Sequence, residues 1–79
     1  MPRFHVDVRD NGSVLADVEG AEFESMDAAV QAAARSAAEI GTGRLAKGDF
    51  SDVVIEVRDE QSQRIFTVRA SMRIDRHGP

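Results

Sequence analysis

Apolar residues recur with a period of two in two stretches near the start of the chain, and Leu15 is an additional apolar residue within the second stretch. Every second residue is apolar across residues 4–8 and again across residues 14–18. A period of two is typical of a strand that buries one face. Asp10-Asn11-Gly12 lies between the stretches and is a strong hairpin-turn signal. The first eighteen residues therefore predict an antiparallel hairpin.

The length of the turn decides which side chains of this hairpin share the buried face. A two-residue loop would pair Val8 with Leu15 and would turn Asp17 toward the apolar face. A three-residue loop over residues 10–12, with its glycine left-handed, pairs Val8 with Val14 and keeps that face apolar. Because a buried face fixes the register, we expect the three-residue loop, with Leu15 on the opposite, exposed face.

The spacing changes to a helical one after Ser25. Apolar residues then recur three and four positions apart, at Met26, Ala29, Val30, Ala33, Ala37 and Ile40. Ser25 is a favourable N-cap, and Asp27 lies in the first turn, where the helix dipole favours an anion. Gly41 and Gly43 each cost a helix about 1 kcal/mol relative to alanine. We therefore expect the helix to fray or kink near Gly41.

A second pair of alternating stretches follows the helix. Residues 53–57 and 66–74 each carry an apolar residue at every second position, and a polar, turn-like segment separates them. Pairing Val57 with Phe66 also pairs Ile55 with Val68 and leaves Glu60 to Gln63 as the loop.

These elements predict an α+β domain of order ββαββ. The four strands form an antiparallel sheet in the order 2-1-3-4, because sequential strands then stay adjacent, and the one helix packs on one face. We expect a single domain over residues 1–75 and a disordered tail over residues 76–79.

The sheet face away from the helix should carry polar and charged side chains of both signs. Such a mixture is typical of a solvated face with cross-strand ion pairs. If the face instead meets a partner, the residues that we expect to face it are His5, Asp7, Arg9, Leu15, Arg58, Arg69 and Arg73.

Composition narrows the classes of function. The net charge is −4, which argues against a large non-specific phosphate-binding surface. The chain has no Tyr or Trp, so a base-stacking platform is not expected, and no Cys, which excludes thiol chemistry and Cys-based metal sites. No signal-peptide pattern and no membrane-spanning apolar run is visible. We expect a cytoplasmic protein that does not bind membranes.

Several segments resemble a known family. They are Met1-Pro2-Arg3-Phe4, Val6 to Asp10, Asp17-x-Glu19-Gly20-x-Glu22 before an alanine-rich helix, and Val57 to Glu60. Together they resemble small alphaproteobacterial, rhizobial-type proteins grouped as a domain of unknown function, number 6894. That family has no assigned activity, so the resemblance implies no catalytic residues. The chain departs from it at His5, where relatives often carry an aromatic residue, and in the two helix glycines.

Three features were weighed as possible chemistry. Gly41 to Ala46 matches the letters of a dinucleotide fingerprint, but it follows a helix instead of joining a strand to a helix, so we interpret it as a helix break. His5 has only His77 as a possible histidine companion for a metal. The acidic residues around Gly20, which are Asp17, Glu19 and Glu22, lack calcium-loop spacing and suit turn capping better.

We therefore expect a protein that is not an enzyme and that needs no cofactor or metal. The favoured hypothesis is a protein-interaction module, a homodimer formed through the edge of the last strand or through the open sheet face. The alternative is a small regulator that binds nucleic acid through the arginine-bearing face. The interleaved carboxylates make nucleic-acid binding the less favoured of the two.

Overall fold

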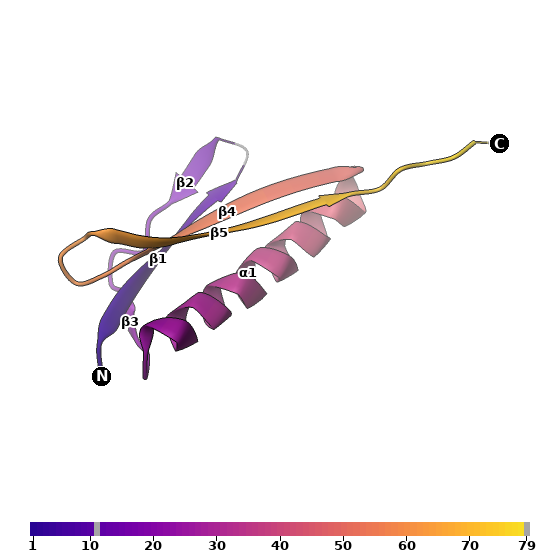
Figure 1. Cartoon of the computed structure of the whole chain (residues 1–79). Helices are drawn as coiled ribbons and strands as arrows, with labels where there is room; N and C mark the ends of the chain where they lie inside the picture. The colour runs from indigo at the N-terminus through magenta and orange to yellow at the C-terminus, as the bar shows by residue number, and fades with distance from the viewer. Residues whose placement is uncertain (11, 79) are drawn as a thin grey trace.

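The chain folds as one antiparallel sheet with one long helix against it (Figure 1). The computed structural model describes residues 1–10 and 12–78. The elements are β1 (Arg3–Asp10), β2 (Ser13–Leu15), β3 (Ala21–Glu22), α1 (Met26–Lys47), β4 (Phe50–Arg58) and β5 (Arg64–Arg73). The predicted α+β class is confirmed.

The order of the main strands is also the predicted one. The sheet runs β2-β1-β4-β5, and every neighbouring pair is antiparallel. The prediction missed β3, a two-residue strand that pairs with Arg3 and Phe4 of β1. β2 pairs with the other end of β1, from Val8 to Asp10. The outer edge of β1 is therefore covered by two short strands in succession.

The predicted register of the first hairpin is wrong. Val8 pairs with Leu15 and Asp10 with Ser13, which leaves two residues in the loop. Gly12 has the expected positive φ, +83°, while Asn11 lies outside the described residues. An Asn-Gly loop matches the twist of the strands it joins. The objection to this register was the burial of Asp17, and that objection disappears because β2 ends at Leu15.

The helix is longer than predicted, and it is not interrupted at the glycines. Ser25 caps it as expected, its hydroxyl accepting a hydrogen bond from Ala28 N at 3.1 Å. The expected break near Gly41 is wrong, because α1 continues through both glycines to Lys47. Gly41 is buried, and a Cβ there would lie 2.5 Å from Met72 Cε. The glycine lets the end of the helix approach β5 closely, and this contact offsets its low helix propensity.

The core lies between α1 and the β4–β5 hairpin. Val53, Ile55 and Val57 of β4 are fully buried against three helix alanines, Ala29, Ala33 and Ala37. The helix packs on β4 and β5 and touches β1 little. Val6 and Val8 of β1 are in consequence only half-buried. The small side chains of these alanines let the helix lie close to the sheet.

The β4–β5 hairpin has the predicted pairing of Val57 with Phe66 and Ile55 with Val68. A bulge follows, and Arg58 pairs with Arg64, so that Ile65 is the extra residue. At the other end the ladder runs past β5, since Ile74 N donates to Asp49 O at 2.9 Å. Arg76 then bonds both oxygens of Asp49, at 2.8 and 2.6 Å. The extent of the domain and the disordered tail stay predictions; Pro79 lies outside the described residues.

Candidate functional site

The helix-free face of the sheet, here called the open face, gathers most of the expected partner-facing residues. In the strand register His5 lies beside Arg58, Asp7 beside Glu56, and Arg9 in one row with Val54 and Arg69. The open face consists of His5, Asp7, Arg9, Val14, Phe50, Asp52, Val54, Glu56, Arg58, Arg64, Thr67, Arg69, Ser71 and Arg73. Six of the seven predicted residues belong to it, and Leu15 does not.

Leu15 is instead on the side of the sheet that carries the helix. Its pairing with Val8 places both on that face. With Ile40 of α1 they line an open groove of about 490 Å³, and Arg44 and Asp10 lie at its rim, joined by an ion pair. Leu15 remains 73% exposed. The wrong hairpin register accounts for the wrong face, because a shift of one residue exchanges the two faces of a strand.

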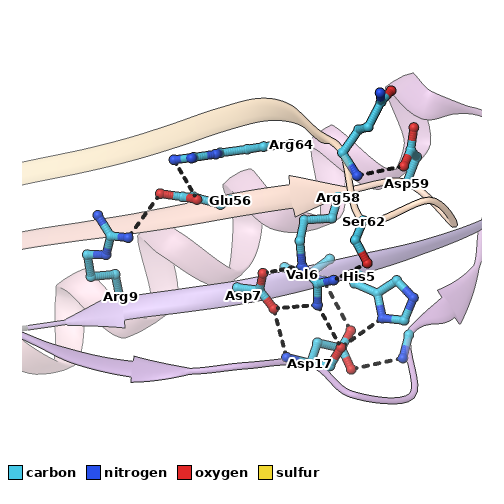
Figure 2. Close-up of polar contacts among 12 residues, drawn as sticks. His5, Val6, Asp7, Arg9, Asp17, Glu56, Arg58, Asp59, Ser62 and Arg64 are labelled. Carbon is cyan, nitrogen blue, oxygen red and sulfur yellow. Dashed lines mark hydrogen bonds and ion pairs between the residues drawn. The ribbon is translucent and has the colours of Figure 1, made fainter.

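Arg58 is the centre of a polar cluster at one end of the open face (Figure 2). Its guanidinium grips both oxygens of Asp7, with Nε 2.5 Å from Oδ2 and Nη2 3.1 Å from Oδ1. Nη2 also donates to the carbonyl oxygen of Asp17 at 3.3 Å, and Nη1 donates to Ser62 Oγ at 3.3 Å. This two-pronged geometry is the strong form of an arginine–carboxylate pair. It joins β1, β4 and two loops.

Asp17 fills the gap between β2 and β3 along the edge of β1. Its carboxylate accepts from Val6 N and Gly20 N, each at 3.1 Å. Its own N–H donates to Asp7 Oδ1 at 2.8 Å. Gly20 has φ +73°, and a Cβ there would lie 2.9 Å from Phe4 O. The side chain of Asp17 thus replaces a missing strand partner, which confirms the predicted turn-capping role for this residue.

His5 joins the same cluster through a contact between its ring and the backbone of Asp17. Its Nδ1 lies 2.8 Å from Asp17 O, and its half-buried ring lies against Gly20. Asp7 lies on the same face of β1, but the hydrogen-bond partner of the ring is the carbonyl of Asp17. A backbone carbonyl on one ring nitrogen fixes the orientation of the imidazole.

The electrostatics of the cluster favour permanent charges. The hydrogen bonds from Arg58 lower the pKa of Asp7 below its usual value, against the opposing effect of partial burial. The same contact raises the pKa of Arg58. A group suited to proton transfer near neutral pH needs a pKa near 7. Since Asp7 and Arg58 are shifted away from neutrality, the pair suits a structural tie better than acid–base catalysis.

The remaining arginines of the open face are also paired with carboxylates. Glu56 lies between Arg9 and Arg64, at 3.3 and 3.1 Å (Figure 2). Asp52 accepts from the Ser71 hydroxyl at 2.9 Å and lies 3.4 Å from Arg69. These cross-strand ion pairs confirm the expectation of a mixed, paired face. They leave little uncompensated positive charge to attract phosphates.

Val54 shows how these charges also protect apolar surface. It points to the open face, in the row between Arg9 and Arg69, yet only 8% of it is exposed. Arginine stems commonly lie along apolar neighbours while the guanidinium reaches solvent or a partner. Long charged neighbours on this face can therefore cover Val54, whereas Val14 and Phe50 on the same face stay exposed.

Within residues 1–10 and 12–78, no three His, Asp or Glu side chains come together as a metal ion would require. Gly41 and Gly43 lie inside α1, where the helix already uses the backbone N–H groups that a pyrophosphate would need. In the described part of the chain α1 is too polar to cross a membrane.

The last strand, β5, lies at one edge of the sheet, as predicted. Among the described strands, β5 pairs with β4 on one side and with nothing on the other. The strand has ten residues, and an unpaired strand edge offers a row of N–H and C=O groups to another chain. Bulges and charges are common protections of such edges, and β5 has a bulge at one end.

Comparison with known proteins identifies the family. A family model described as Domain of unknown function (DUF6894) matches residues 3–71. The chain belongs to this family, as the resemblance of its strands and turns suggested. No match of significance was found among curated proteins. None was found among solved structures either.

Proposed function

We propose that this domain is a non-enzymatic protein-interaction module that forms a homodimer through the free edge of β5. The observation that carries the proposal is the ten-residue strand with one unpaired edge. An antiparallel strand added to such an edge gains main-chain hydrogen bonds along its length. A two-fold axis allows two identical edges to satisfy each other.

The slender core gives a reason for self-association. In α1 only three alanines and Gly41 are buried, and the molecule measures 54 × 22 × 16 Å. A chain of this size buries only about 60% of its unfolded surface. Association through β5 would shield the half-buried outer row of the core, which includes Phe66 and Val68. Dimerisation would thus add to the small free energy of folding that we expect from the monomer.

The proposal also includes a non-enzymatic role, supported by the paired charges, and a bacterial source, supported by the sequence. The cluster around Arg58 is committed to joining strands and loops, which supports a binding role over an enzymatic one. The resemblance of the chain to rhizobial-type proteins supports an alphaproteobacterial source, and we propose a cytoplasmic location. Fractionation of the native cells, with detection of the untagged protein, tests that location.

Light scattering and sedimentation of the full chain from about 1 to 500 μM test the dimer. We expect a concentration-dependent rise from 8.6 kDa toward twice that mass. A clean monomer over the whole range would refute the proposal. A rise that persists in 1 M salt would fit strand pairing, whereas ion-pair association weakens as salt screens it.

Nucleic-acid binding through the open face stays the alternative. Its five arginines, Arg9, Arg58, Arg64, Arg69 and Arg73, each lie within 4 Å of a carboxylate. Retention on RNA or heparin that falls steeply with salt would favour the alternative. An absence of chemical-shift changes on adding RNA at low salt would remove it.

A further inference from the structure

The regular part of β5 has well-defined limits. The bulge that includes Ile65 interrupts the ladder before Phe66. From Phe66 the pairing is regular as far as Arg73, and the Ile74 N–H still bonds Asp49 O. A bulge bends and twists its strand, so it ends flat edge-to-edge pairing. The segment available to a second strand is therefore Phe66 to Ile74, and its midpoint is Ala70.

We propose that two copies join their β5 strands antiparallel with Ala70 opposite Ala70 of the second copy, forming one continuous eight-stranded central sheet. The inference rests on the proposed dimer and adds its register. In this register Phe66 lies opposite Ile74 of the second copy, and Val68 opposite Met72. All of these side chains lie on the helix side of the sheet. Ile74 is 38% exposed in the single chain.

Charges on the open face favour the same register. It places Arg69 opposite Ser71 of the second copy and Thr67 opposite Arg73. Asp52 lies next to Ser71 in the row, so the guanidinium meets a hydroxyl and then a carboxylate. Like charges directly opposite one another are destabilising. A register centred on Arg69 would place two guanidiniums face to face, and one centred on Val68 would set Ser71 against the bulged Ile65.

The helix is placed so that it meets its copy instead of blocking it. Because α1 lies over β4 and β5, the two helices would be antiparallel and about two strand spacings, or about 10 Å, apart. Packed helices lie about 8–10 Å apart when their contact residues are small. The strand spacing and the helix spacing are therefore compatible.

Small residues occupy the flank of α1 that this contact would use. Ile40 and Arg44 lie on the β1 side, since Ile40 lines the groove with Val8 and Arg44 pairs with Asp10. The buried residues of α1 are Ala29, Ala33, Ala37 and Gly41. The residue after each of them lies about 100° further round the helix, on the flank away from β1. Those residues are Val30, Ala34, Ala38 and Thr42. This flank of α1 is compatible with a close contact between the two helices. The proposal itself depends on the free edge of β5.

Single cysteines test the register, because the natural chain contains none. Arg69→Cys in one tagged chain and Ser71→Cys in another should form a disulfide-linked heterodimer on mild oxidation. Arg69→Cys alone should link slowly, since its copy is displaced diagonally and a disulfide needs Cβ atoms about 3.8 Å apart. Thr67→Cys mixed with Arg69→Cys is the matched control, and it should also link slowly.

The two proposals fail in different ways. A monomer in light scattering removes the dimer itself. A dimer that links fastest through Arg69→Cys alone, or through the Thr67→Cys and Arg69→Cys mixture, keeps the dimer and overturns the register, because these patterns report centres at Arg69 and Val68. A dimer in which none of these pairs links also overturns the register.

A charge exchange gives an independent measurement on the cysteine-free chain. Thr67→Arg faces Arg73 of the second copy twice per dimer and should weaken dimerisation roughly 2- to 30-fold. Thr67→Arg combined with Arg73→Glu should restore it. Gln31→Arg adds the same charge to an exposed helix position and should leave the dimer unchanged. Equal effects of Thr67→Arg and Gln31→Arg would overturn the register.

Discussion

Arg58 lies opposite His5 in the strand ladder, yet its guanidinium binds Asp7, two residues along β1. The diagonal contact leaves the same guanidinium within reach of Asp17 O. One side chain therefore ties the central pair of strands to the loop that covers the β1 edge.

Replacing Arg58 with lysine should destabilise the fold measurably, because charge-assisted hydrogen bonds with two-pronged geometry are among the stronger ones in proteins. Lysine keeps the charge but cannot bind both carboxylate oxygens in the planar geometry of arginine. Urea unfolding followed by circular dichroism gives the free energy. Arg69→Lys is the control, since that exposed pair with Asp52 should cost less than about 0.5 kcal/mol. Equal losses in the two variants would contradict the central role of Arg58.

Stability should fall in acid partly because Asp7 becomes protonated. Its pKa in the folded chain is lowered, mainly by Arg58. Its contribution is therefore complete above the unfolded value of about 3.9, and it is lost as the pH falls through the lower folded value. Asp7→Asn should flatten the decline of unfolding free energy below about pH 4.

Asp49 provides the control for that titration. Arg76 lowers its pKa in the same direction, but the pair is exposed at the end of the sheet. Solvent screening weakens such pairs, so Asp49→Asn should change the acid slope less than Asp7→Asn. The comparison is made at low salt, by urea titrations at a series of pH values. A larger effect of Asp49→Asn would contradict the assignment of the acid dependence to the Asp7–Arg58 pair.

The two helix glycines should respond differently to alanine. A Cβ at Gly43 meets nothing within 4 Å, so Gly43→Ala should stabilise the helix by about 0.5–1 kcal/mol. At Gly41 the new methyl would lie 2.5 Å from Met72 Cε and 3.4 Å from Ser51 Oγ. Met72 must then move, so Gly41→Ala should gain less than Gly43→Ala, and Gly41→Val should destabilise. Thermal unfolding of the three variants ranks them.

The left-handed glycines form a second matched pair. Gly20→Ala combines φ +73° with a close contact to Phe4 O and the His5 ring, and it should cost about 2–3 kcal/mol. Gly12→Ala has φ +83° but open space, so only the backbone strain of about 1 kcal/mol remains. Denaturant unfolding measures both. Equal losses would mean that the packing of Gly20 against β1 contributes nothing.

Alternation and helical spacing were sufficient to predict the sheet order, the helix start and the second hairpin. Each of these follows from side chains that choose between a buried and an exposed face within a few residues. The first hairpin was mispredicted because its register was chosen as if the second strand continued through Asp17. The strand ends at Leu15, and the end of a strand is set by contacts that no local pattern records.

The polar layer was only partly predictable for the same reason. The alternation placed His5, Asp7 and Arg58 on one face, but it did not indicate that Asp17 would serve as a substitute strand partner for Val6. Gly20, three residues later, is the signal that could have indicated the tight turn. Gly41 was misjudged because helix propensity counts only the cost of a glycine, whereas burial against Met72 gives it a use.

The sideways placement of α1 over β4 and β5 has a consequence for breathing motions. Amides in the middle of β4 lie under the helix and between two strands, so their hydrogen–deuterium exchange should require global unfolding. Amides of Ser13–Leu15 belong to an edge that the helix does not cover, and they should exchange through local opening. The short strand β2 would then open well before the rest of the sheet, and among the strands a protease would cut there first.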